Sequence, residues 1–147
     1  MGKHRIVTDV ANHRSDWERL YAGYAAFYKV DQSPEMRERV WSWIAEGRIT
    51  CLMALDAEGK PIGIAHLREF LRPLMSSLGG YLDDLFVDPD LRGAGVADDL
   101  FEAMRELGRE RGWSVIRWIT REDNYRARAV YDRLATRTNW TTYDLSV

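Results

Sequence analysis

The sequence has only one cysteine, Cys51, so it cannot form an intramolecular disulfide bond. This composition suits a reducing compartment, and we expect a cytoplasmic protein. No apolar run approaches the roughly 18 to 20 residues that a membrane-spanning helix needs. The opening segment MGKHRIVTDV also lacks the apolar stretch of a signal peptide. The sequence therefore predicts no membrane partner.

An excess of basic charge is also missing. The chain carries 21 Lys and Arg against 23 Asp and Glu, which gives a net charge of −2. We therefore expect no nucleic-acid partner, because nothing in the balance of charge would attract one. No cluster with metal-ligand spacing is visible, so we predict no metal. Apolar residues make up 46% of the chain, which is enough for one core, and we predict a single domain over residues 1–147.

The hydrophobic pattern predicts a mixed order of strands and helices. We expect four helices, at 16–30, from Ser33-Pro34 to a stop at Gly47, at 95–111 and at 125–134. We expect strands at 4–9, 49–55, 61–70, 79–87, 113–120 and 140–145, with a loop at 71–78. This order indicates an α/β fold of the mixed α+β type, with one mixed sheet flanked by about four helices.

The segment Arg92-Gly93-Ala94-Gly95-Val96-Ala97 follows the strand that ends at Val87 and opens a helix. Small residues let the backbone approach an anion, and the free amides of the first helical turn point toward it. Arg92 adds a charge-assisted contact. A nucleotide-triphosphate loop is excluded because no Gly-Lys-Ser/Thr follows, and a dinucleotide loop because the third glycine is missing. The glycines alone are equally consistent with an ordinary strand–turn–helix junction.

Two blocks of the sequence together resemble the GNAT superfamily of acyl-CoA-dependent N-acetyltransferases. The first block is Arg or Gln, two residues, Gly, one residue, then Gly or Ala, and it is matched by Arg92, Gly95 and Ala97. The second is Asn-x-x-Ala-x-x-x-Tyr after the next strand, matched by Asn124, Ala127 and Tyr131. The resemblance runs from about residue 79 to residue 131. After Tyr131 the chain departs from the Gly-Phe that many members carry.

The resemblance implies a single GNAT-like domain whose mostly antiparallel sheet has splayed central parallel strands. The pantetheine arm of acetyl-CoA, the expected cosubstrate, would lie between the strand ending at Val87 and the strand from Trp113. It would pair with the backbone of Leu85, Phe86 and Val87. The loop from Arg92 to Ala97 would bind the pyrophosphate, and Asn124 and Ala127 would also contact the cofactor.

Attack of an amine on a thioester needs an acid and a base, because the ammonium must lose a proton and the thiolate leaves best when protonated. The resemblance assigns Tyr131 as the acid, whereas in isolation it would be interpreted as a packed helix residue. On a regular strand Asp83 shares a face with Leu85 and Val87, so we favour Asp83 over Asp84 as the base. A bulge would exchange the two acids. The other interpretation is that both acids are only surface charges or substrate anchors.

We therefore predict transfer of an acetyl group from acetyl-CoA to a primary amine of a small molecule, by direct attack in a ternary complex. The segment from Leu82 to Val87 is similar to the strand of diamine and polyamine acetyltransferases, and paired acids suit a cationic acceptor. The alternatives are a protein Lys or N-terminal amine as acceptor, and a non-catalytic acyl-CoA-binding sensor. The sequence is also compatible with a homodimer. We give His66 and Cys51 structural roles.

Overall fold

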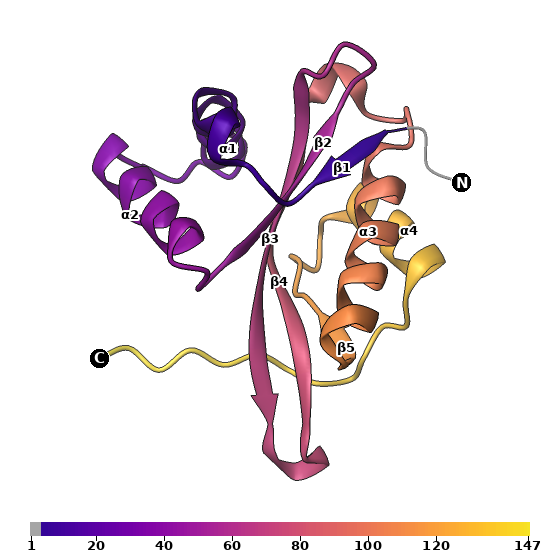
Figure 1. Ribbon diagram of the computed structural model, residues 1–147. Coiled ribbons are helices and arrows are strands. Elements are labelled where there is room, and N and C mark those ends of the chain that lie inside the picture. Colours follow the sequence, from indigo (N-terminus) through magenta and orange to yellow (C-terminus); the bar gives the residue numbers. More distant parts are fainter. Residues whose placement is uncertain (1–3) are drawn as a thin grey trace.

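The computed structural model describes residues 4–147, and Figure 1 shows one sheet with helices on both of its faces. The strands lie in the order β1-β2-β3-β4-β5. They are β1 Arg5–Val7, β2 Thr50–Leu55, β3 Pro61–Arg72, β4 Ser77–Val87 and β5 Trp113–Arg117. The helices are α1 Arg14–Phe27, α2 Pro34–Ala45, α3 Val96–Arg111 and α4 Tyr125–Leu134. The first three strand pairs are antiparallel and β4–β5 is parallel, which confirms the predicted mixed α/β fold.

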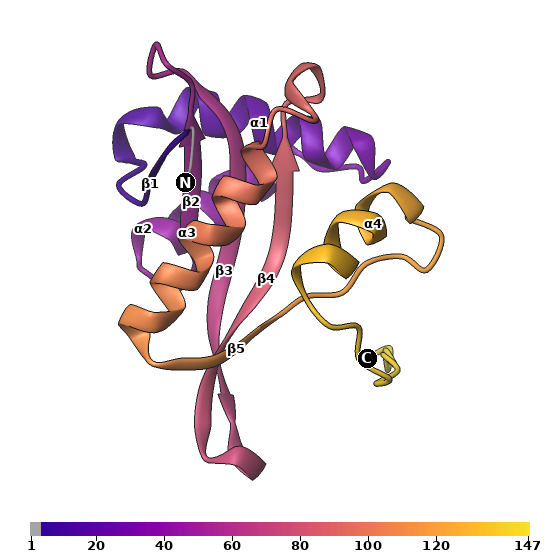
Figure 2. The same cartoon turned by 90° about the vertical axis from the view of Figure 1, so that its right-hand side faces the viewer.

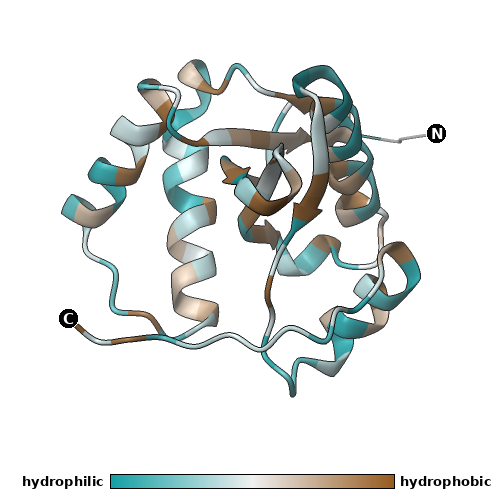
Figure 3. Cartoon of the chain, turned by 90° about the horizontal axis from the view of Figure 1, so that it is seen from below, coloured by the Kyte–Doolittle hydropathy of each residue, from teal (hydrophilic) through white to brown (hydrophobic). Residues whose placement is uncertain are grey.

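The sheet separates two hydrophobic clusters, one on each face. Residues of β2, β3 and β4 alternate between them, as the period of two along a strand requires. One cluster packs under α3 and is built around Leu67, Leu82, Leu100 and Met104. The other packs under α1 and α2 and is built around Trp17, Leu20, Met53 and Ile64. Figure 3 shows mostly hydrophobic strands between helices of mixed hydropathy.

The predicted loop at residues 71–78 is wrong. Strands β3 and β4 continue through it, pairing as far as Arg72 with Ser77, and a short 3₁₀ turn at Pro73–Met75 joins them. The hairpin projects beyond the helices (Figure 1), so neither of its faces is buried. Leu74 at the tip is 97% exposed. Without a buried face there is no alternation of apolar and polar residues, and the sequence pattern could not reveal these strands.

The predicted last strand, Trp140–Leu145, is also wrong. Residues 136–147 pair with no strand of the described chain, and the side chains of Trp140, Tyr143 and Leu145 are 82%, 90% and 89% exposed. The segment leaves α4 in an extended conformation and runs away from β5 (Figure 1). Tyr143, Leu145 and Val147 have the alternation of a half-buried strand, but such a pattern does not specify which edge the strand would join.

The parallel strands β4 and β5 separate along their length, as the family resemblance implies. They pair only at Leu78 with Trp113, Gly80 with Ile116 and Tyr81 with Arg117. Beyond Tyr81, β4 continues to Val87 with β3 as its only partner among the described strands. Figure 2 shows the two strands diverging, with β5 leading toward α4. The part of β4 from Leu82 to Val87, called its upper half below, therefore has an open backbone edge inside the fold.

Packing of Trp113 on Gly80 holds the paired end of β4 and β5 together, and this contact can be tested. A Cβ atom at Gly80 would lie 2.3 Å from Cζ3 of Trp113, whereas one at Gly108 on α3 would lie 3.5 Å from Cε3 of the same ring. We expect Gly80→Ala to lower the free energy of unfolding by about 1–3 kcal/mol through overpacking. Gly108→Ala should raise it by about 0.5–1 kcal/mol, because alanine is the better helix former. Urea denaturation of both variants measures the difference, and equal effects would contradict it.

Candidate active site

The upper half of β4 contains a β-bulge at Asp83. In the register with β3, Ala65 pairs with Leu85 and His66 with Asp84, but Leu67 pairs with Leu82, so Asp83 has no partner. The extra residue shifts the alternation of side chains along the strand. Leu82, rather than Asp83, therefore shares with Leu85 and Val87 the face that packs under α3. The parity argument that favoured Asp83 as the base is wrong, because it assumed a regular strand.

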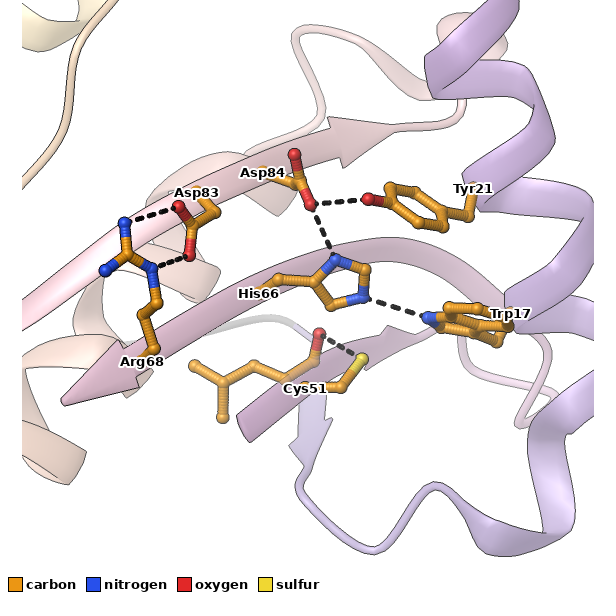
Figure 4. A network of polar contacts seen from close by, with 8 residues as sticks. Trp17, Tyr21, Cys51, His66, Arg68, Asp83 and Asp84 are labelled. Carbon is orange, nitrogen blue, oxygen red and sulfur yellow. Dashed lines mark hydrogen bonds and ion pairs between the residues drawn. The ribbon is translucent and has the colours of Figure 1, made fainter. Parts of the chain in front are cut away.

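Both acids lie on the face of the sheet that α1 covers. Asp83 accepts two hydrogen bonds from Arg68, at 2.9 and 3.2 Å. Asp84 bonds His66, and Arg68 and His66 are two residues apart on β3, so they share a face. Figure 4 shows the two pairs side by side. The pairs differ in exposure: the Arg68 and Asp83 side chains are 48% and 30% exposed, whereas those of His66 and Asp84 are 1% and 20% exposed.

Asp84 belongs to a hydrogen-bonded network that joins β4, β3 and α1. Its Oδ2 accepts from the Tyr21 hydroxyl at 2.9 Å and lies 2.9 Å from Nδ1 of His66. On the other side of the imidazole, the indole N–H of Trp17 donates to Nε2 at 2.9 Å. The other carboxylate oxygen, Oδ1, takes part in neither bond and points away from both partners (Figure 4).

The network sets the ionisation of its members. Burial alone would raise the pKa of Asp84, but hydrogen bonds from His66 and Tyr21 lower it, so the carboxylate is ionised at neutral pH. Burial and the charge of Asp84 both raise the pKa values of Tyr21 and Tyr24, and these phenols stay neutral. The result is one negative charge bordered by neutral aromatic donors.

Sequence reasoning missed the tyrosines of this network. Trp17, Tyr21, Tyr24 and Tyr28 follow one another at intervals of four, three and four residues, which places them on one face of α1. Spacing alone predicts ordinary core positions of an amphipathic helix for these residues. The excess of hydroxyl-bearing rings on that face was the available signal, because phenols near a sheet carrying two acids find polar partners there.

The open edge of β4 presents the backbone groups that the family resemblance assigns to the cofactor. The N–H of Asp88 donates to Ile62 O on β3 at 2.8 Å. Because backbone groups alternate in direction along a strand, those of Phe86 also point toward β3, and those of Leu85 and Val87 point toward the open side. The backbone of Phe86 is therefore turned away from the gap, and its ring is buried under α1. The predicted cofactor contacts of Leu85 and Val87 have suitable geometry, whereas that of Phe86 does not.

The loop between β4 and α3 places free amides at the beginning of a helix. Gly93 and Gly95 have φ values of 86° and 85°, a conformation that favours glycine. Gly95 is the N-cap residue of α3, and the first bond within the helix runs from Asp99 N to Gly95 O. The N–H groups of Val96, Ala97 and Asp98 therefore have no partner within the helix, and Ala94 bonds back to Leu91. This is the geometry expected of an anion site.

Arg92 and the acids of α3 modify the electrostatics of this loop. The guanidinium of Arg92 lies 4.9 Å from the centre of the Phe27 ring, which ties the loop to the end of α1. Asp98 and Asp99 occupy the first turn of α3, and their negative charges oppose an anion. Both are engaged with cations or donors: Arg133 of α4 bonds Asp98, and His4 bonds Asp99. Arg92 is therefore the nearby positive charge of the loop itself.

The second block of the sequence lies at the start of α4 and along it. Asn124 precedes the first turn of α4 and donates to Thr120 at 3.3 Å, and Ala127 and Tyr131 follow at three and seven residues along the same face. The Tyr131 ring packs at 5.3 Å from Trp118. Burial raises the pKa of Tyr131, and Tyr28 at the end of α1 raises it further. Tyr131 is thus a neutral phenol near the residues that close α1.

Cys51 and Trp41 have structural surroundings. Cys51 is buried at 1% exposure, as predicted. Trp41 packs 5.0 Å from Trp17 within the cluster under α1. Within residues 4–147, no three His, Cys, Asp or Glu side chains gather in a way that could hold a metal ion. None of the helices in this part of the chain is long and apolar enough to cross a membrane.

A splayed pair of parallel strands, a glycine loop at a helix N-terminus and a tyrosine on the following helix together define an acyl-CoA-dependent acetyltransferase. A model of the acetyltransferase (GNAT) family matches residues 17–135. The chain therefore belongs to this family, whose members use acetyl-CoA as cosubstrate.

Individual relatives agree with this assignment. The chain is 27% identical over 144 residues to the D-amino-acid N-acetyltransferase HPA3 of Saccharomyces cerevisiae, covering 95% of this chain and 89% of the relative. A crystal structure of a probable acetyltransferase superposes with a TM-score of 0.88 at 26% identity, over 97% of both chains. The ribosomal-protein-alanine N-acetyltransferase of Brucella melitensis biovar Abortus 2308 has the same fold, with a TM-score of 0.82 at 19% identity over 99% of this chain and all of that one.

The pyrophosphate role of the loop remains a prediction, and paired glycine variants test it. Gly95 and Gly47 both have positive φ values, and neither has an atom within 4 Å of an added Cβ. We expect Gly95→Glu to weaken acetyl-CoA binding at least about tenfold, because its carboxylate would stand over the free amides in place of the phosphate. Gly47→Glu introduces the same backbone strain at the end of α2 and should leave the affinity unchanged. Calorimetry measures both, and unchanged affinity in a folded Gly95→Glu protein would remove the loop from the cofactor site.

Proposed function

We propose that the protein transfers the acetyl group of acetyl-CoA to the primary amine of a small cationic molecule, by direct attack in a ternary complex. The observation that carries this proposal is the ionised Asp84, which lies on the half of β4 that β5 leaves unpaired and borders the hydroxyl groups of Tyr21 and Tyr24. A carboxylate in this position attracts an ammonium group to the place where β4 and β5 separate. Neutral tyrosine rings beside it add favourable cation–π surroundings.

The acceptor class can be narrowed by the relatives. HPA3, the yeast relative, is a D-amino-acid N-acetyltransferase, which supports an amino acid or a similar amine-bearing metabolite as acceptor. A polyamine acceptor rests only on the similarity of the segment Leu82–Val87. A protein Lys or N-terminal amine is the alternative acceptor, and a non-catalytic acyl-CoA sensor is the alternative class. A homodimer and a cytoplasmic location stay predictions.

The proposed reaction uses the residues of both sides of the gap. Asp84 binds the ammonium group of the acceptor. The ammonium then loses a proton, either to the carboxylate of Asp84 or to water. The neutral amine attacks the thioester carbonyl, and the N–H of Leu85 stabilises the oxyanion. The tetrahedral intermediate collapses, the C–S bond breaks, and Tyr131 donates its proton to the leaving thiolate. The nitrogen of the new amide loses its second proton, and this proton restores the phenol of Tyr131. A neutral phenol is required for the donation to the thiolate, and the raised pKa of Tyr131 provides it.

Release of free thiol from acetyl-CoA tests the function directly. The assay is run with D- and L-amino acids, diamines, polyamines and a lysine-containing peptide. Turnover with a free amine supports the proposal, turnover with the peptide alone favours a protein acceptor, and binding of acetyl-CoA without any turnover favours the sensor.

Tyr131→Phe is expected to lower kcat by about 10²–10⁴-fold, because a general acid acts in the transition state. Acetyl-CoA affinity should change little, since the ring remains packed against Trp118. Tyr143→Phe, at a position that is 90% exposed, serves as the control and should behave like the unsubstituted protein. Unchanged turnover of Tyr131→Phe with the true acceptor would exclude this tyrosine from the mechanism.

The two acids of the bulge are distinguished by their pH–rate profiles. We expect Asp84→Asn to lose rate chiefly near neutral pH, where most of the acceptor amine is protonated, and to recover partly at high pH, where the neutral amine is abundant. Asp83→Asn should be milder and lack that recovery, because Asp83 is already paired with Arg68. The reverse pattern would assign the base to Asp83, and two unchanged profiles would mean that neither acid takes the proton.

A further inference from the structure

His66 is the one buried polar or charged side chain among the described residues, at 0% exposure. It lies behind Asp84 and has no contact with the open edge of β4, so it cannot touch a substrate. Burying an imidazole costs free energy unless both ring nitrogens are satisfied. Here both are, because Asp84 bonds Nδ1 and Trp17 bonds Nε2, each at 2.9 Å (Figure 4).

The two partners fix the protonation of the ring. An indole N–H can only donate, so Nε2 must be the acceptor and carries no proton. A carboxylate that is ionised can only accept, so Nδ1 must carry the proton. While both bonds persist, His66 is therefore neutral. A second proton would place an N–H against the N–H of Trp17.

The hydrogen bond from Trp17 favours a neutral imidazole, whereas the other neighbours of His66 favour the protonated ring. Burial lowers the pKa of His66, but the hydrogen bond and charge of Asp84, together with Cys51 of β2, raise it to about 9. Among the described residues, Tyr21 of α1 also faces the ring, and its ring centre lies 4.7 Å away. Without a donor at Nε2, the imidazole would be a cation at neutral pH and would cancel the charge of Asp84.

We propose that Trp17 and His66 are positioning residues that act as a unit, in which the indole N–H keeps the imidazole neutral so that Asp84 faces the acceptor as an uncompensated negative charge. The proposal rests on the proposed function in one respect, that the ammonium of the acceptor meets Asp84. It also excludes His66 as a proton relay. Nδ1 is already protonated, and Nε2 is occupied by the donor of Trp17, so the ring has no site for a proton arriving from Asp84.

The protonation of His66 can be measured without any acceptor, by the ¹⁵N chemical shifts of its ring in the ligand-free protein. We expect one protonated nitrogen, Nδ1, from about pH 6 to pH 8 in the unsubstituted protein. Two protonated nitrogens at pH 7, or a proton on Nε2 alone, would overturn the proposal. In Trp17→Phe, which removes the donor, the ring should be doubly protonated at pH 7, because the hydrogen bond and charge of Asp84 raise its pKa. A ring that stays neutral in a folded Trp17→Phe protein would overturn the role of Trp17.

Paired His66 variants separate positioning from proton transfer. Glutamine carries an acceptor and a donor on one planar amide and does not titrate, so His66→Gln should keep KM for the cationic acceptor and the pH profile close to those of the unsubstituted protein. His66→Leu loses the donor to Asp84 and should raise KM at least about tenfold, which corresponds to a lost hydrogen bond to a charged group. A His66→Gln profile that loses an ionisation would overturn the proposal, because it would show that the imidazole itself takes the proton. If no amine in the panel is acetylated, the proposed function fails, and the ring measurements still decide the state of His66.

Discussion

A single extra residue in β4 decides which side chains reach which side of the sheet. Side chains alternate along a strand, so both halves of β4 can be buried correctly only if the alternation is shifted between them. The bulge at Asp83 makes this shift, and Leu82 and Leu85 both enter the cluster under α3. The same shift turns Asp84 toward α1, where His66 and Tyr21 bond it. The packing of the core and the position of the acid thus have one cause.

The candidate site combines this acid with elements that meet from distant parts of the chain. β4 and β5 separate after Tyr81, the loop before α3 offers free amides, and α4 brings Tyr131 near the end of α1. Each part is weak evidence by itself, because helix N-termini, edge strands and buried tyrosines occur in many proteins. Their convergence on the one place where the sheet opens is what a thioester and an amine require in order to meet.

The sequence predicted those parts that depend on local chemistry. The glycine loop before α3, the start of α2 at Ser33-Pro34 and the extent of α3 all have signatures within a few residues, and the structure has each at the predicted place. The bulge has no such signature, since one inserted residue leaves the composition of a strand unchanged. The network of Trp17, His66 and Asp84 joins residues 49 and 18 positions apart, so only the register of β3 with β4 and the packing of α1 reveal it. The strands near the hairpin tip have no alternating pattern because neither face of the hairpin is buried there. The segment 136–147 has such a pattern, but the pattern does not specify a partner strand, and its large side chains are exposed.

The open edge of β4 affects which substitutions the sequence can accept. The groups that this edge would offer to the cofactor are the N–H and C=O groups of Leu85 and Val87, which every residue except proline possesses. Substitutions at these positions change the packing under α3 but leave the row of donors and acceptors in place. With the proposed function, this half of the site would tolerate mutation, whereas the acceptor side would depend on individual side chains such as Asp84. Sequences of this kind can therefore diverge widely while the backbone groups of this strand edge stay the same. A structure with 26% identity still superposes on this chain with a TM-score of 0.88.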